Sequence, residues 1–115
     1  MSESERYNKL VIIEKYDNFV NYIYPALQNV ERKHGFVKEK TLLAIFNQVE
    51  LFYKALKTNQ KSRLYEADAN LASIRYYLRF LADGKRKLIS KKQHQVASIK
   101  LAEVGGILHS WIKGK

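Results

Sequence analysis

The stretch that most constrains this chain runs from Leu64 to Ala82, LYEADANLASIRYYLRFLA, and contains neither glycine nor proline. It predicts one long helix, because no residue in it interrupts helical backbone. At about 100° per residue, its apolar side chains form two arcs rather than the single stripe of an ordinary surface helix. We expect one arc to face the core and the other to face a partner, such as a second copy of the chain. The core arc comprises Leu64, Ala67, Leu71, Ile74, Leu78, Leu81 and Ala82, and the second arc comprises Tyr65, Ala69, Ala72, Tyr76 and Phe80.

The N-terminal part predicts a helix at about residues 7–33. A kink is expected at Pro25, because proline removes a backbone donor and clashes with the preceding turn. Gly35 is expected to end the helix in a left-handed conformation, with basic residues in the last turn. The apolar residues placed near one face are Leu10, Ile13, Val20 and Tyr24.

A second helix is predicted at about residues 37–58, ending in a tight hairpin near Asn59. Its apolar residues recur at three- and four-residue spacing: Leu42, Ile45, Phe46, Val49, Phe52, Tyr53 and Leu56. The third helix contains the stretch from Leu64 to Ala82. It is predicted at about residues 62–83, and Asp83 and Gly84 are expected to end it.

A fourth helix is predicted at about residues 91–112. Ser90 and Gln93 have the spacing of a capping box, which starts a helix. Gly105 and Gly106 lie inside it and permit close approach of another backbone. Its apolar face comprises Ala97, Leu101, Val104, Leu108 and Trp111. Four helices with short connections predict an all-α fold, an antiparallel up-down-up-down four-helix bundle that forms a single domain over residues 1–115.

Charge is the strongest compositional signal. The chain has 21 Lys+Arg against 11 Asp+Glu, a formal net charge of +10. Residues 85–115 hold eight basic side chains and a single acid, Glu103. Such an excess is typical of a protein that binds nucleic acid, because Lys and Arg release counterions from phosphates. The alternatives are a solubilising surface or an acidic protein partner.

Several functional classes are disfavoured. There is no cysteine, which excludes disulfides and thiolate metal sites. The first ten residues, MSESERYNKL, lack the apolar core of a signal peptide, and no apolar run is long enough to span a membrane, so we expect a cytoplasmic protein. Glu31 and His34 have the spacing of one bundle metal motif, but a di-iron site needs a second. We therefore predict no enzyme activity, no metal, no cofactor and no small-molecule substrate.

A polar strip separates the two arcs of the long helix and carries Arg75 and Arg79 at i,i+4. Like charges at this spacing repel, so a group outside the helix must compensate. Either neighbouring acids form an internal polar layer with them, or they project toward a partner's carboxylates or phosphates. The candidate acids are Glu14, Asp17, Glu50 and Glu103.

The connector before the fourth helix is the candidate nucleic-acid contact. Lys91 and Lys92 occupy the first turn of that helix, where the dipole disfavours cations. Such local violations are enriched at functional sites. The candidate phosphate-contacting residues are Lys85, Arg86, Lys87, Lys91, Lys92 and, further along the helix, Lys100. Base stacking on the eight tyrosines is the less favoured alternative to a core or interface role.

Three segments resemble the accessory variability determinant proteins of diversity-generating retroelements, within the wider group of four-helix-bundle proteins that includes the ribosomal-RNA intervening-sequence proteins. They are YIYPALQNVERKHG (22–35), the segment 46–83 with NQVELF and LYxADAxLAxxRxxLRFLA, and LAEVGGILHSWI (101–112).

The resemblance implies a barrel-shaped homopentamer of basic four-helix subunits. Such a protein partners the element's reverse transcriptase and binds RNA or DNA, in support of mutagenic retrohoming. Arg75 and Arg79 match the family's arginines and are the expected reverse-transcriptase or RNA contact, and we expect Tyr65, Tyr76 and Phe80 at the subunit interface. The alternatives are a stand-alone RNA-associated bundle of the intervening-sequence type and a structural oligomer with an acidic partner.

Overall fold

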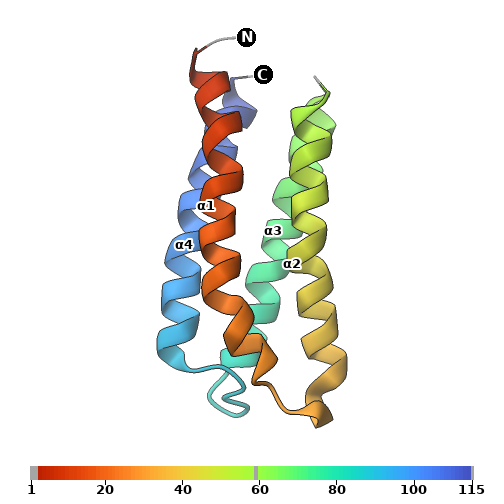
Figure 1. The fold of residues 1–115 in the computed structure, drawn as a ribbon, viewed down its shortest axis with the longest axis vertical. Coiled ribbons are helices and arrows are strands. Elements are labelled where there is room, and N and C mark those ends of the chain that lie inside the picture. The colour runs from red at the N-terminus through yellow and green to blue at the C-terminus, as the bar shows by residue number, and fades with distance from the viewer. Residues whose placement is uncertain (1–2, 59, 115) are drawn as a thin grey trace.

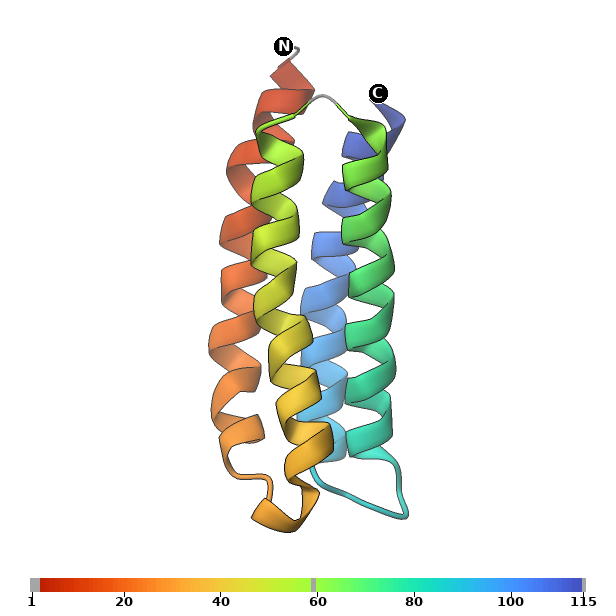
Figure 2. The same ribbon diagram turned by 90° about the vertical axis from the view of Figure 1, so that its right-hand side faces the viewer.

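The computed structural model describes residues 3–58 and 60–114, which form four long helices. These are α1 (Glu3–Gln28), α2 (Gly35–Leu56), α3 (Lys61–Ala82) and α4 (Lys91–Lys113), with a short 3₁₀ helix, η1 (Arg32–His34), before α2. Figures 1 and 2 show them running alternately up and down in an elongated bundle with both chain ends at the same end. No strand occurs in the described residues, so the predicted all-α four-helix bundle is confirmed.

The core of the bundle uses one of the two apolar arcs of α3. Leu64, Ala67, Leu71, Ile74, Leu78 and Leu81 are all buried, as the periodicity predicted. The second arc points away from the core, since Tyr65 and Tyr76 are each about half exposed. All five predicted core residues of α4 are buried as well. The apolar pattern of these two helices therefore identified the core, except that Ala82, the last member of the predicted core arc, is only partly buried.

The core face of α1 differs from the predicted one. Tyr24 is exposed, and Ile13 and Val20 are only partly buried, while the side chain of Leu10 lies outside the described residues. Among the described side chains of α1, the buried ones are Ile12, Tyr16, Phe19, Ile23, Ala26 and Leu27, and Val30 is buried just beyond the end of the helix. A physical reason is the hydroxyl of Tyr16, which donates a hydrogen bond to the carbonyl of Ile45 on α2 and must face inward to reach it. Burial of this phenol raises its pKa.

The end of α1 also corrects a prediction. Pro25 lies inside the helix, which ends at Gln28, and the kink stays a prediction. Gly35 is not a left-handed terminator: its φ is −57°, and it is the first residue of α2. The ammonium of Lys38 instead caps α1, donating to the carbonyls of Gln28 at 3.1 Å and Val30 at 3.4 Å. A cation that bonds the last carbonyls stabilises a helix end without any glycine.

Buried amides hold α2 against α3. The side chain of Gln48, fully buried, donates to the carbonyl of Ala67 at 2.9 Å. Asn70 donates to the Gln48 amide oxygen at 2.8 Å and to the carbonyl of Ala44 at 2.9 Å. Buried amides that satisfy one another in this way fix the register of two helices. The predicted hairpin near Asn59 falls between α2 and α3, and Asn59 itself lies outside the described residues.

No helix in the described ranges combines the length with the apolar character needed to cross a bilayer.

Candidate partner and nucleic-acid interface

Arg75 lies over the seam between α3 and α4. A Cβ atom at Gly105 of α4 would stand 2.7 Å from Nη2 of Arg75, so the guanidinium lies directly against the glycine backbone. Gly105 is buried, whereas Arg75 is exposed. The predicted close approach at Gly105 therefore involves an arginine side chain rather than another backbone.

Arg79 lies one turn further along α3, beside an aromatic ring. Its guanidinium carbon is 5.5 Å from the ring centre of Tyr76. Arg86, from the connector after α3, lies 3.7 Å above the ring of Phe80. These four side chains and Asp83 surround a hollow of about 290 Å³. An arginine that rests on an aromatic face can keep its N–H fork free for carboxylate or phosphate, which is the case for Arg79, whereas Nη1 of Arg86 also lies 3.8 Å from the Asp83 carboxylate.

The internal polar layer is absent from the described residues, because neither Arg75 nor Arg79 forms an ion pair with any of them. Glu103 is held instead by Lys15 of α1 at 3.4 Å. Asp17 accepts a hydrogen bond from Asn21 at 3.2 Å. Both arginines are exposed, which matches the alternative in which they project outward.

The connector between α3 and α4 is a hydrogen-bonded loop. The carbonyl of Asp83 accepts from the backbone N–H groups of Arg86 at 2.9 Å and Lys87 at 2.8 Å. Its carboxylate accepts from the N–H of Lys85 at 2.8 Å and lies 3.8 Å from the Arg86 guanidinium. Buried Ile89 then ties the loop to the core. The basic side chains of the loop therefore project from an ordered backbone.

The start of α4 follows the prediction closely. The hydroxyl of Ser90 accepts from the N–H of Gln93 at 2.9 Å, and the Gln93 side chain accepts from the N–H of Ser90 at 2.8 Å. This capping box makes Lys91 and Lys92 the first two residues of the helix, and both are exposed. Together with Lys85, Arg86 and Lys87 they form what we call the cationic end.

Lys100 does not belong to the cationic end. It lies near the middle of α4, where its ammonium is 5.7 Å from the ring centre of Tyr22 on α1. Lys100 is also only partly exposed. Five of the six predicted phosphate-contacting residues therefore lie in the connector and the first turn of α4. The sixth, Lys100, lies on the surface between α1 and α4.

α2 has an exposed apolar surface that was not predicted from the sequence. Phe36, Leu43, Phe46 and Tyr53 are exposed, Phe36 by 81% and Leu43 by 64%. Tyr24 of α1 meets Phe46 edge-to-face, with ring centres 6.0 Å apart. A signal was available, because Ile45–Phe46 and Phe52–Tyr53 are adjacent pairs that cannot both face the core of a bundle. We call these four residues of α2 the α2 surface.

The described residues contain no group of three or more His, Asp or Glu side chains placed to hold a metal ion. Glu31, which has metal-motif spacing to His34, is exposed and lies 3.6 Å from the ammonium of Lys33.

The fold and this surface define a small, basic four-helix-bundle protein. Comparison with protein families gives a match to the family described as bAvd-like over residues 10–114. The chain therefore belongs to the bAvd-like family, in agreement with the resemblance to accessory variability determinant proteins. No curated protein sequence matches the chain.

Proposed function

We propose that this protein is a non-catalytic accessory factor of a diversity-generating retroelement, acting in the cytoplasm. In this role it binds the element's reverse transcriptase and nucleic acid, template RNA or complementary DNA, in support of mutagenic retrohoming. Membership of the bAvd-like family supports the accessory role.

The cationic end is the observation that carries nucleic-acid binding. Of its five cations, only Arg86 forms an ion pair within the described ranges, with Asp83. Lys85, Lys87, Lys91 and Lys92 are exposed and gathered on one short connector and the helix turn that follows it. When Lys and Arg side chains bind the phosphates of a nucleic acid, the counterions condensed on those phosphates are released, and this release favours binding.

Arg75 and Arg79 of α3, with Arg86 of the connector beside them, are the proposed polymerase contact. Arg79 and Arg86 border one hollow, each against an aromatic ring, which reduces the side-chain freedom lost on binding. Arg75 lies on the same helix, one turn before Arg79, and adds a third exposed guanidinium. Two or three pre-positioned guanidinium groups suit carboxylates of an acidic protein surface as well as phosphates.

Self-assembly as a homopentamer is supported by two exposed apolar surfaces. A closed ring requires two different surfaces on each subunit, because the contact between neighbours is head-to-tail. One is the second arc of α3, with Tyr65 and Tyr76, and the other is the α2 surface. Phe80, the third predicted interface residue, is covered on one ring face by Arg86 and is only partly exposed. Large apolar side chains that gather on an exposed helix face are typical of protein–protein contact sites.

The test is binding of template RNA at increasing salt, with and without the element's reverse transcriptase. We expect the logarithm of the RNA affinity to fall linearly with the logarithm of salt concentration. We also expect the polymerase to co-purify with the protein at moderate salt. RNA binding without polymerase binding would instead support a stand-alone RNA-associated bundle. If the protein binds no RNA but binds an acidic protein partner, the result would support a structural oligomer.

A further inference from the structure

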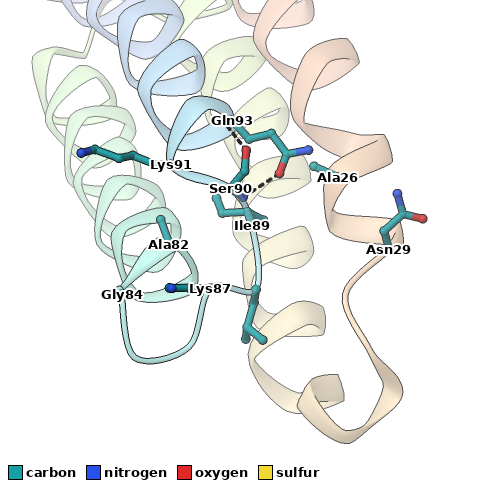
Figure 3. A pocket seen from close by; sticks show the side chains of 10 residues that line it. Ala26, Asn29, Ala82, Gly84, Lys87, Ile89, Ser90, Lys91 and Gln93 are labelled. Carbon is teal, nitrogen blue, oxygen red and sulfur yellow. Dashed lines mark hydrogen bonds between the residues drawn. The ribbon is translucent and has the colours of Figure 1, made fainter.

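The cationic end borders a cavity that the proposed function does not use. It has a volume of about 740 Å³ and lies where the end of α1, the end of α3 and the start of α4 meet (Figure 3). Its size is within the range of ordinary small-ligand sites. An assembly contact through α2 and the outer arc of α3 would leave this end of the bundle accessible.

The floor of the cavity is apolar and made by small side chains. Ala26 of α1 and Ala82 of α3 come from different helices, and Leu88 and Ile89 complete the floor from the connector. Ile89 and Ala26 are buried, so the floor is part of the core. Two alanines near the ends of α1 and α3 leave room for a flat group to lie against the aliphatic side chains.

The rim of the cavity is polar and carries positive charge. Lys87 and Lys91 extend toward the α3 side, while the Gln93 amide points toward Ala26 on the α1 side (Figure 3). The Gln93 oxygen accepts from the Ser90 N–H, which leaves its NH₂ group available as a donor. Asn29 adds a second amide on α1. None of the described residues around the cavity is acidic.

Lys87 has an unusual backbone. Its φ is 50°, the left-handed region that normally favours glycine or asparagine, and it is the one non-glycine residue with positive φ among those described. Strained residues that persist in a well-bonded loop are enriched at functional sites. Lys87 is also one of the residues that line the cavity.

We infer that this cavity receives one unstacked base of a single-stranded nucleic acid, with the neighbouring phosphates on Lys87 and Lys91. The inference rests on the proposed nucleic-acid binding and specifies how one part of the strand is held. A base has flat faces that suit the aliphatic floor and a hydrogen-bonding edge that suits Gln93 and Asn29. The two cations complement phosphate, whereas an apolar peptide would leave both without a counter-charge.

The experiment uses a single-stranded RNA oligonucleotide in which one 2-aminopurine is flanked by adenines. Stacking quenches this base, and none of the residues that line the cavity is aromatic, so insertion should raise its fluorescence several-fold. Ala82→Met fills the cavity and should abolish the rise, with an affinity loss of about tenfold. The matched control is Ala102→Met, which changes an exposed alanine of α4 outside the cavity lining and should behave as the unmodified protein.

A second variant does not depend on tolerance of a larger side chain. Lys87→Gly removes the left-handed strain, so it should raise the unfolding temperature while it reduces both the fluorescence rise and the affinity. Lys85→Gly removes the same charge from the same connector but lies outside the cavity lining, so it should keep the fluorescence rise.

Two results would overturn the inference while leaving nucleic-acid binding intact. One is a fluorescence rise that persists in Ala82→Met and Lys87→Gly. The other is equal affinity for the single strand and for the same sequence in a duplex, whose bases are not available. Failure of the unmodified protein to bind any oligonucleotide would instead overturn the proposed function itself.

Discussion

Arg75 on α3 and Gly105 on α4 fit together as a side chain and the space left for it. A Cβ atom at Gly105 would stand 2.7 Å from Nη2 of Arg75, closer than real Cβ contacts come. The two residues belong to separate segments of the family resemblance, LYxADAxLAxxRxxLRFLA and LAEVGxILxSWI. A glycine inside a helix lowers stability by about 1 kcal/mol relative to alanine. The position of the guanidinium gives a physical reason for a glycine at this point of the helix.

Gly105→Ala should displace the Arg75 side chain without unfolding the bundle. The contacted atom is the far end of a flexible side chain, so the backbone need not move. We expect weaker binding of the partner that Arg75 contacts, measured by titration against reverse transcriptase and against RNA separately. The control is Gly106→Ala, where a Cβ would meet no atom within 4 Å and the gain should be up to about 1 kcal/mol in stability alone. Equal effects of the two substitutions would contradict this account.

Arg75→Ala and Arg79→Ala should leave the fold intact, since both side chains are exposed and pair with no acid in the described part of the chain. Exposed charges contribute at most about 1 kcal/mol to folding. Chemical denaturation should therefore give nearly unchanged stability, while polymerase binding is lost. If either variant unfolds, the arginines have a structural role.

Lys91→Glu combined with Lys92→Glu should weaken RNA binding by a similar factor for all sequences, because phosphate contacts carry no sequence information. The slope of log affinity against log salt should also become shallower, by about 1 for each phosphate contact removed. Reversal of an exposed cation on α2, Lys54→Glu, is the matched control away from the cationic end. A loss confined to particular sequences would contradict backbone contact.

Tyr16 should make the protein labile at alkaline pH. Burial raises its pKa above the ordinary value of 10.0, so the neutral phenol is favoured in the folded state. The contribution of Tyr16 is then fully present below pH 10 and is lost as the pH rises toward the higher pKa of the folded state. The free energy of unfolding should fall by about 1.4 kcal/mol per pH unit in that range.

The control for this prediction is Tyr16→Phe. It should cost about 1–3 kcal/mol at neutral pH, because the Ile45 carbonyl loses its hydrogen bond, and should lack this alkaline loss. Denaturant unfolding of both proteins between pH 8 and pH 11 measures the difference. Parallel pH profiles would mean that Tyr16 is not the source.

Periodicity predicted most of the fold, for a physical reason. The two arcs of α3 and the single face of α4 follow from the helical repeat, and the capping box at Ser90 and Gln93 is a local interaction. The wrong predictions concern the end and the core face of α1, which depend on residues distant in the sequence. Lys38 caps α1 from α2, so Gly35 has no terminating role, and Tyr16 orients α1 through its bond to Ile45.

The candidate site was predictable in composition and less so in geometry. Charge counting identified the five residues of the cationic end, but not the left-handed backbone of Lys87 or the cavity beside it. The stacking of Arg86 on Phe80 depends on where the connector folds back, which no local pattern specifies. The contact of Arg79 with Tyr76 is local, since the two residues are three apart on α3. The α2 surface was not predicted, because Phe46 and Tyr53 belong to a set of apolar residues at three- and four-residue spacing, which is typical of a core-facing helix.

The central claim is that copies of this basic bundle assemble and carry a reverse transcriptase. The most direct measurement is the mass of the complex formed with the element's reverse transcriptase and template RNA at moderate salt, for the unmodified protein and for Tyr76→Asp and Phe46→Asp. The account predicts a complex with five copies of the chain and a bound polymerase, and loss of the pentamer in both variants. A chain that stays monomeric and binds neither polymerase nor RNA would contradict it.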